Sequence, residues 1–269
     1  MESTVKILSG NPDSPVLAVE HLSARFGDNV VFTDINFQVN SGEKLVVAGE
    51  SGCGKSTLLK MMIGLQKPTS GRILFHGGDI QEADEQKLND YRRSIGVLFQ
   101  SSALFSSMTI GENIALGLNA FTDVDPTMTD LIVKMKLSMV NLTGYENHYP
   151  SELSGGMKKR AGIARAMALD PAVLFFDELS AGLDPVTSAE LDGLIQEING
   201  ALKTTMIIVS HELASIFAIA DRVIMLSKET KGIIAEGRPS DLKENSPDPR
   251  VRNFFHRRAP QTQERHHGQ

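Results

Sequence analysis

A glycine-rich octet in the first quarter of the chain has the residue types of a phosphate-binding loop. Residues 49–56 read Gly-Glu-Ser-Gly-Cys-Gly-Lys-Ser. Glycines let the backbone turn so that several N–H groups point at one anion, and a helix beginning beside Lys55 adds its positive dipole end. Lys55 is expected to reach the β- and γ-phosphates of a nucleotide, and Ser56 to ligate Mg²⁺. The predicted nucleotide-binding residues are Gly49, Glu50, Ser51, Gly52, Cys53, Gly54, Lys55, Ser56 and Thr57.

Two carboxylates close an apolar run much later in the chain. Residues 173–176 are Val-Leu-Phe-Phe, and Asp177 and Glu178 follow directly. Asp177 is the expected protein partner of Mg²⁺, and the carboxylate of Glu178 can polarise an attacking water. A strand that ends in Asp-Glu is weak evidence by itself, because strand ends often carry exposed acids. Downstream of a phosphate-binding loop, the pair predicts metal-assisted hydrolysis of a nucleoside triphosphate.

These motifs require strands and helices around them. Residues 44–48 form a short apolar run that favours a buried strand before the loop, and residues 55–64 indicate a helix that ends at glycine. The pattern predicts an α/β fold interrupted by a helical insertion at about residues 101–165. Further strands are predicted at residues 16–26, 30–39, 72–75, 95–99, 173–176, 205–209 and 222–226, and further helices around residues 82–93, 110–118 and 128–139.

One predicted helix of the insertion carries an apolar stripe rich in methionine. Asp125 suits its start as a capping residue, and Pro126 suits the first helical position. Methionine is flexible and fills irregular gaps, so we expect the stripe to pack in the core and not to bind a ligand. The members of the stripe are Met128, Leu131, Ile132, Met135 and Met139.

The composition is that of an ordinary folded protein. The 269 residues are 41% hydrophobic and 22% charged. No apolar run approaches the ~20 residues that span a bilayer, and residues 1–10 show no secretory signal. The net charge of -6 gives no sign of a nucleic-acid partner. The single cysteine, Cys53, excludes an internal disulfide and fits the cytoplasm.

The order of the remaining motifs resembles that of the ATP-binding cassette (ABC) ATPases over about residues 16–242. Gln100 resembles the glutamine of the family's Q-loop, which acts at Mg²⁺ and water and couples to a membrane partner. His211 resembles the switch histidine that touches the γ-phosphate. Phe26 resembles the aromatic residue that stacks on adenine, for which a π-face suffices. Each assignment has an alternative: Gln100 could be an ordinary polar residue at a strand end, His211 a structural histidine, and Phe26 a core-packing residue.

The resemblance also implies that half of the site comes from another protomer. Residues 153–157, Leu-Ser-Gly-Gly-Met, resemble the family's signature motif. In that motif Ser154, Gly155 and Gly156 would contact the γ-phosphate bound to a second copy, through amides at a helix N-terminus. Asp184 resembles the aspartate of the D-loop, which crosses the dimer interface, although a surface turn is the alternative. A homodimer that closes on two Mg·ATP is therefore implied.

Three positions depart from the family pattern. Met157 replaces the usual glutamine of the signature, which removes a side-chain contact and leaves the backbone contacts. Leu179 replaces the proline that usually follows the catalytic glutamate, and we expect this to loosen the turn. Cys53 lies inside the phosphate loop, where alkylation is expected to hinder nucleotide binding by bulk.

Local stretches narrow the resemblance to the ATPases of Mce-type lipid transporters, including the Mla phospholipid systems. Residues 99–105 and 248–254 are similar to stretches of that group, and Met157 is typical of its signature. Residues 179–183 depart from Mla-type chains, so a paralogous Mce system is an alternative. The resemblance implies an integral-membrane permease, an Mce-domain lipid-binding protein, and a peripheral position on the cytoplasmic face of the inner membrane.

The expected fold is that of P-loop NTPases of the ABC type, with a RecA-like lobe, an antiparallel β subdomain and a helical subdomain. We expect an N-terminal tail (1–15), an ATP-binding domain (16–245, with the helical subdomain at about 101–165) and a basic C-terminal extension (246–269). The extension is expected either to be solvated or to pack on the second protomer.

Two other functions stay open: the ATPase of a small-solute importer, and a regulatory switch with little turnover. Glu178 argues against the switch, and the absence of a long coiled-coil insertion or basic run argues against a DNA-acting machine.

Overall fold

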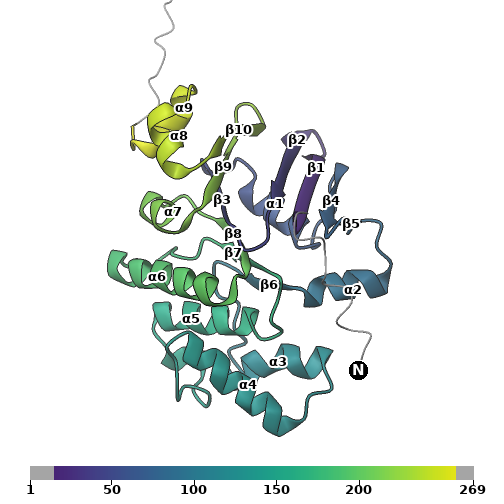
Figure 1. The fold of residues 1–269 in the computed structure, drawn as a ribbon, viewed down its shortest axis with the longest axis vertical. Coiled ribbons are helices and arrows are strands. Elements are labelled where there is room, and N and C mark those ends of the chain that lie inside the picture. The colour runs from purple at the N-terminus through teal and green to yellow at the C-terminus, as the bar shows by residue number, and fades with distance from the viewer. Residues whose placement is uncertain (1–14, 259–269) are drawn as a thin grey trace, which may run out of the picture.

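The computed structural model describes residues 15–258, which are built around a six-stranded sheet (Figure 1). The strand order is β10-β9-β3-β8-β7-β6, in which β10 runs antiparallel to β9 and the other neighbours are parallel. The short runs of valine, isoleucine and phenylalanine suit this sheet because both of its faces are covered. The bounds are Lys44–Gly49 (β3), Ile95–Leu98 (β6), Val173–Asp177 (β7), Thr205–Val209 (β8), Arg222–Ser227 (β9) and Gly232–Gly237 (β10).

A second sheet contains four antiparallel strands in the order β2-β1-β4-β5. Gly27, at φ 58°, lies in the turn between β1 and β2, and Phe26 pairs with Asn29 across that turn. The turn leaves the Phe26 ring at the end of its strand, where 48% of the residue is exposed. The bounds are Leu17–Phe26 (β1), Asn29–Val39 (β2), Ser70–Phe75 (β4) and Gly78–Asp79 (β5).

The helices cover both faces of the six-stranded sheet and form a separate layer at one end (Figure 1). Capping side chains begin several of them: Thr109 forms a capping box with Glu112, and Asp125, Ser154 and Asp184 accept bonds from first-turn amides. The bounds are Lys55–Met62 (α1), Glu85–Arg93 (α2), Ile110–Phe121 (α3), Pro126–Met139 (α4), Gly155–Ala166 (α5), Pro185–Leu202 (α6), Leu213–Ile219 (α7), Pro239–Asn245 (α8) and Pro249–Phe255 (α9), with a short 3₁₀ turn at Pro150–Glu152.

The buried core has two parts, one on each face of the six-stranded sheet. Along β3, Leu45 and Val47 face the part that includes α1 and the antiparallel sheet. Val46 and Ala48 face the part that includes α5 and α6. This alternation is the period of two that a strand imposes on its side chains. Every strand and helix for which the sequence predicted bounds is present within a few residues of those bounds, which confirms the α/β class.

The expectation for the methionine stripe of α4 is wrong for most of the stripe. Met128, Leu131 and Met135 are 47%, 55% and 48% exposed, while Ile132 and Met139 are partly buried against the core. The fully buried side of the helix is instead made by Thr129, Val133, Lys136 and Leu137. The buried Lys136 ammonium forms an ion pair with Asp170, which allows a lysine to occupy a core-facing position.

The described part of the C-terminal extension packs against the chain's own α7. Val251 and Phe255 of α9 are buried, and the Phe255 ring lies edge-on to Phe217 of α7 at 5.7 Å between centroids. Arg250 is paired with Glu229 at 2.7 Å, close to the turn between β9 and β10. Residues 1–14 of the predicted N-terminal tail (1–15) and residues 259–269 of the predicted extension lie outside the described residues. Between residues 15 and 258, no helix has both the length and the apolar character to cross a membrane.

Candidate functional site

The glycine-rich loop follows the central strand β3 and leads into α1. A Cβ at Gly49, where φ is 141°, would lie 2.4 Å from the Leu226 carbonyl oxygen. A Cβ at Gly54, where φ is 103°, would lie 2.7 Å from a methyl group of Val31. Glycine is required at both positions because the backbone is packed against its neighbours and adopts the left-handed region. The loop therefore wraps closely around the start of α1.

Lys55 is buried at the start of α1 and holds the loop in shape. Its Nζ donates to the carbonyl oxygens of Gly49 at 2.8 Å and Glu50 at 3.0 Å. The capping residue Gly54 has no side chain to accept bonds from the first-turn amides of α1. Those amides and the Lys55 ammonium can therefore bind an anion, because a phosphate is a stronger acceptor than a neutral carbonyl.

A cavity of about 800 Å³ opens over this loop. Its size lies within the ~300–1,000 Å³ that is usual for ligand sites. Phe26 lies on its wall near one end of the antiparallel sheet, and Glu178 and His211 lie on its wall from the six-stranded sheet. The remaining lining residues are Asn29, Val31, Gly49, Glu50, Ser51, Gly52, Gly54, Lys55, Ser56, Thr57 and Phe254. The folded chain thus brings a polar phosphate-binding end and an exposed aromatic ring to one cavity.

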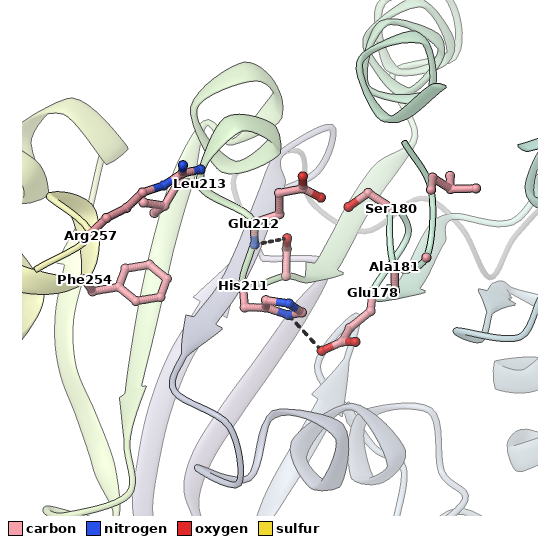
Figure 2. Close-up of a pocket in the computed structure, with 11 residues that line it drawn as sticks. Glu178, Ser180, Ala181, His211, Glu212, Leu213, Phe254 and Arg257 are labelled. Atoms are coloured by element: carbon pink, nitrogen blue, oxygen red, sulfur yellow. Dashed lines mark hydrogen bonds and ion pairs between the residues drawn. The ribbon is translucent and has the colours of Figure 1, made fainter. Parts of the chain in front are cut away.

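Glu178 and His211 meet at the carboxyl ends of β7 and β8. The His211 Nδ1 lies 3.0 Å from the Glu178 Oε1. Figure 2 draws this interaction as a dashed line. The Glu178 side chain is 24% exposed, and its backbone φ of 50° is unusual for a residue other than glycine. Its N–H donates to the Val209 carbonyl at 3.0 Å, which ties it to the neighbouring strand. A carboxylate that is largely shielded from solvent and contacts a histidine is placed to orient a water.

Asp177 has the surroundings of a metal ligand. Its Oδ1 is buried and has no hydrogen-bond partner within residues 15–258. Burial raises the pKa of Asp177, the neighbouring charge of Glu178 raises it further, and Lys60, the Ser56 hydroxyl and Lys55 lower it in part. Hard oxygen donors of this kind fit Mg²⁺, which usually keeps waters and phosphate oxygens as its other ligands. Residues 15–258 contain no group of three or more His, Cys, Asp or Glu side chains that could hold a metal ion.

Some predicted site residues do not line this cavity. Cys53 is 1% exposed and points into the core beneath the loop. Gln100 is exposed at the end of β6, and Ser154 begins α5, where its Oγ accepts from the Met157 amide at 3.3 Å. Asp184 caps α6 by accepting from the amides of the first turn, and its bond with the Thr187 hydroxyl lowers its pKa. Gln100, residues 154–156 and Asp184 therefore lie outside the lining of the cavity over the phosphate loop.

Three residues at the site were not predicted from the sequence. Phe254 and Arg257 of the C-terminal segment face Glu178 and His211 across a second cavity of about 470 Å³ (Figure 2). Phe254 also lines the first cavity, so its ring lies where the two cavities adjoin. Lys159 of α5 donates to the carbonyl oxygen of Glu178 at 3.3 Å. Nothing in the sequence around Phe254 or Lys159 indicates that these residues lie at this site. Phe254 belongs to a Phe-Phe pair near the C-terminus, and Lys159 is the second lysine after the signature-like motif.

Comparison with known proteins identifies the family. The model of the ABC transporter family matches residues 32–181. The intermembrane phospholipid transport system ATP-binding protein MlaF of Haemophilus influenzae is 39% identical over 240 residues, covering 89% of this chain and 90% of the relative. The MlaF of Escherichia coli K12 is 41% identical over 229 residues, covering 85% and 84%. A probable ribonucleotide transport ATP-binding protein, mkl, of Mycobacterium leprae is 39% identical over 247 residues, covering 92% and 70%.

Solved structures agree with this match. The cbiO1 of Clostridium perfringens, part of an ABC transporter complex, has a TM-score of 0.79 at 29% identity, covering 87% of this chain and 92% of that chain. A dimeric ATP-binding cassette in a post-hydrolysis state, bound to ADP and Pi, has a TM-score of 0.74 at 26% identity, covering 82% and 98%. The overall fold is therefore that of ABC ATPase cassettes. The chain belongs to the ABC transporter family and is an ABC-type ATPase.

Proposed function

We propose that the chain is the ATP-hydrolysing subunit of an ABC transporter that moves phospholipid through a partner permease. The observation that carries the proposal is the single cavity over the phosphate loop, which Lys55, Glu178 and His211 all line. In this proposal the loop residues 49–57 bind the phosphates and Phe26 stacks on adenine. Glu178 polarises the attacking water, and His211 holds the Glu178 carboxylate and senses the γ-phosphate.

Mg²⁺ is proposed to bind between Ser56 and Asp177, with Gln100 joining when the site is assembled. The unpartnered Oδ1 of Asp177 supports this assignment. When bound, the ion neutralises charge on the β- and γ-phosphates. The chain's own residues provide the rest: Lys55 reaches the phosphates, and Glu178 accepts a proton from the water at its carboxylate.

The active unit is proposed to be a homodimer. Ser154, Gly155 and Gly156 start α5 but do not line the cavity of their own chain. Amides at this helix N-terminus would contact the γ-phosphate that is bound to a second copy. The dimeric form of the ADP- and Pi-bound structural neighbour supports this assembly. Within each protomer, residues 16–245 would be the ATP-binding domain, about 101–165 its helical part, and 246–269 an extension.

The cargo is proposed from the relatives. The MlaF proteins of two organisms are described as serving intermembrane phospholipid transport, whereas mkl at the same 39% identity is described as a ribonucleotide transport protein. We favour phospholipid because residues 99–105, Met157 and residues 248–254 all resemble lipid-transporter ATPases. The partners would then be an integral permease and an Mce-domain protein. The chain would lie on the cytoplasmic face of the inner membrane.

The first experiment tests hydrolysis. The purified chain is compared with Glu178→Gln for ATPase rate and with Lys55→Ala for ATP binding. We expect Glu178→Gln to lower the rate by about 10²-fold or more while ATP still binds, because general-base removal typically costs 10²–10⁴-fold. Equal rates for the wild type and Glu178→Gln would favour a regulatory switch.

The second experiment tests the cargo and the partners. The tagged chain is purified from detergent-solubilised membranes, its partners are identified, and the complex is reconstituted into liposomes. We expect an integral permease and an Mce-domain protein to co-purify, and phospholipid to stimulate the ATPase. Stimulation by ribonucleotide but not by lipid, or co-purification with a solute-binding protein, would assign the chain to another transporter class.

A further inference from the structure

Lys159 joins three segments that are far apart in the sequence. It lies on α5, a little more than one turn beyond the signature-like Ser154. Its Nζ donates to the backbone carbonyl oxygen of Gln100 at 2.7 Å and to that of Glu178 at 3.3 Å. One ammonium group therefore contacts the end of β6, the end of β7 and the helix that carries residues 154–156.

The Lys159 ammonium group is buried. Lys159 is 5% exposed, and the salt bridges found within residues 15–258 do not include it. Burial lowers the pKa of Lys159, and the charges of Glu178 and Asp177 offset part of that effect. A buried ammonium is costly unless its donors are satisfied, so the two carbonyl contacts must be maintained for the charge to remain buried.

The helix around Lys159 is fixed to the segment after β6. A Cβ on Gly96 of β6 would lie 2.1 Å from the Ala166 carbonyl oxygen, so α5 and β6 are in backbone contact. Arg165 of α5 donates to the carbonyl oxygens of Ser102 at 3.0 Å and Ala103 at 2.6 Å. Helix α5 and residues 100–103 therefore form one packed unit.

The backbone of Glu178 is strained and is held by hydrogen bonds on both sides. Its φ of 50° is a strained conformation for glutamate, so its backbone direction depends on the groups that hold it. On one side its N–H donates to the Val209 carbonyl. On the other, its carbonyl accepts from the Ala181 N–H at 3.1 Å and from Lys159 at 3.3 Å. A shift of α5 would change the contact with Lys159 and leave the N–H bond to Val209 in place. This would change the backbone conformation of Glu178 and with it the direction of its carboxylate.

We propose that Lys159 is a positioning residue that couples the placement of α5 to the orientation of Glu178 in the same protomer. The inference rests on the proposed function, in which residues 154–156 of α5 contact ATP bound to a second copy. Binding of ATP by one copy would then set the catalytic carboxylate of the other through Lys159. The two sites would hydrolyse ATP cooperatively, although neither nucleotide touches the Lys159 side chain.

The experiment compares Lys159→Met, Lys159→Arg and the matched control Lys158→Met. Lys158 is the neighbouring lysine on α5 and is only partly buried. For each protein, kcat, KM, the Hill coefficient of ATP hydrolysis, ATP affinity and Tm are measured. We expect Lys159→Met to lower kcat at least tenfold and bring the Hill coefficient to 1, with ATP affinity within threefold of wild type. We expect Lys159→Arg to recover most of the rate, and Lys158→Met to behave as wild type.

Several results would overturn the proposal. These are an unchanged kcat and Hill coefficient in Lys159→Met, or an equal loss in Lys158→Met. If Lys159→Met does not fold, Lys159→Gln, which keeps N–H donors without the charge, is measured in the same way. A Lys159→Gln enzyme with wild-type kcat and Hill coefficient would support carbonyl positioning, and one that loses ATP affinity in proportion to kcat would refute it. A wild type no faster than Glu178→Gln would refute the proposed function itself, whereas Glu178-dependent hydrolysis that does not depend on Lys159 would refute this inference alone.

Discussion

The contact between α5 and β6 predicts that two glycine-to-alanine substitutions differ strongly in their effect on the free energy of unfolding. Gly96 and Gly162 both lie in this contact. An alanine Cβ at Gly96 would lie 2.1 Å from the Ala166 carbonyl oxygen, which belongs to backbone, and 2.7 Å from a methyl of Leu174. An alanine Cβ at Gly162 would lie 2.4 Å from a methyl of Leu98, which is the far end of a side chain. The first overlap requires the helix to move away from the strand, and the second requires one side chain to rotate.

The magnitudes follow from these two contacts. Overpacking costs about 1–3 kcal/mol, and a backbone overlap belongs at the upper end, so we expect Gly96→Ala to lose about 3 kcal/mol of unfolding free energy. For a chain of this size each kcal/mol shifts Tm by roughly 2–4 °C, which gives a fall of roughly 6–12 °C. For Gly162→Ala, about 1 kcal/mol of overpacking is offset by about 1 kcal/mol of helix propensity gained over glycine. Its Tm should stay within a few degrees of wild type.

The assay is calorimetric unfolding of both variants without nucleotide, followed by ATPase measurements below both transitions. Gly96→Ala displaces α5, and with it Lys159 and Ser154, so its kcat should fall more than its ATP affinity. Gly162→Ala is the matched control in the same contact. A Gly96→Ala protein as stable as the wild type, or a Gly162→Ala protein less stable than Gly96→Ala, would refute the reasoning.

Three further predictions concern buried or cavity-lining groups. Burial raises the pKa of Asp192, which is 6% exposed. The protonated carboxyl therefore stabilises the folded state at pH values below the ordinary aspartate pKa, and this stabilisation is lost as pH rises through the raised pKa. The Tm of Asp192→Asn should rise relative to that of wild type as pH increases from about 4 toward neutral, and a Tm difference that does not change with pH would contradict this. Burial also raises the pKa of the Cys53 thiol, so iodoacetamide should modify the folded protein far more slowly than the urea-unfolded protein at pH 8. Equal modification rates would contradict this. If the modified protein has the same ATP affinity as the unmodified protein, the bulk of the adduct does not hinder nucleotide binding. Phe254→Ala should raise the KM for ATP about threefold or more, because its ring lines the cavity over the phosphate loop. The Tm should change little, since the buried Phe255 anchors α9. His256→Ala, at an exposed position, is the control, and an equal change of KM in both variants would show that Phe254 does not contribute to ATP binding.

The nucleotide-binding part of the site could be predicted because its chemistry is local in the sequence. The loop needs a strand before it, glycines within it and a helix after it, and all three are contiguous around residues 44–62. The same holds for Asp177 and Glu178 at the end of an apolar run. Helix starts were predictable where a capping side chain and a proline are adjacent, as at Asp125 and Pro126.

Burial and distant contacts could not be predicted in this way. The stripe of α4 was expected in the core, yet Leu131 is 55% exposed while Lys136 is 1% exposed, because the helix presents its other side to α3 and α5 and Asp170 neutralises the lysine. The spacing of apolar residues along a helix shows that the helix has an apolar side, but it does not show which neighbouring element covers that side. The placements of Phe254 and Lys159 depend on which carbonyls and cavities the chain brings near them.

The sequence by itself therefore determined the phosphate-binding loop, the acidic pair and the order of strands and helices, because each depends on residues adjacent in the chain. The tertiary structure decided that Glu178 meets His211, that Cys53 points away from the nucleotide cavity, and that Lys159 bonds to Gln100 and Glu178. These arrangements arise when parallel strands bring their carboxyl ends to one edge and a helix packs against that edge. Sequence spacing carries no information on which of these ends become neighbours.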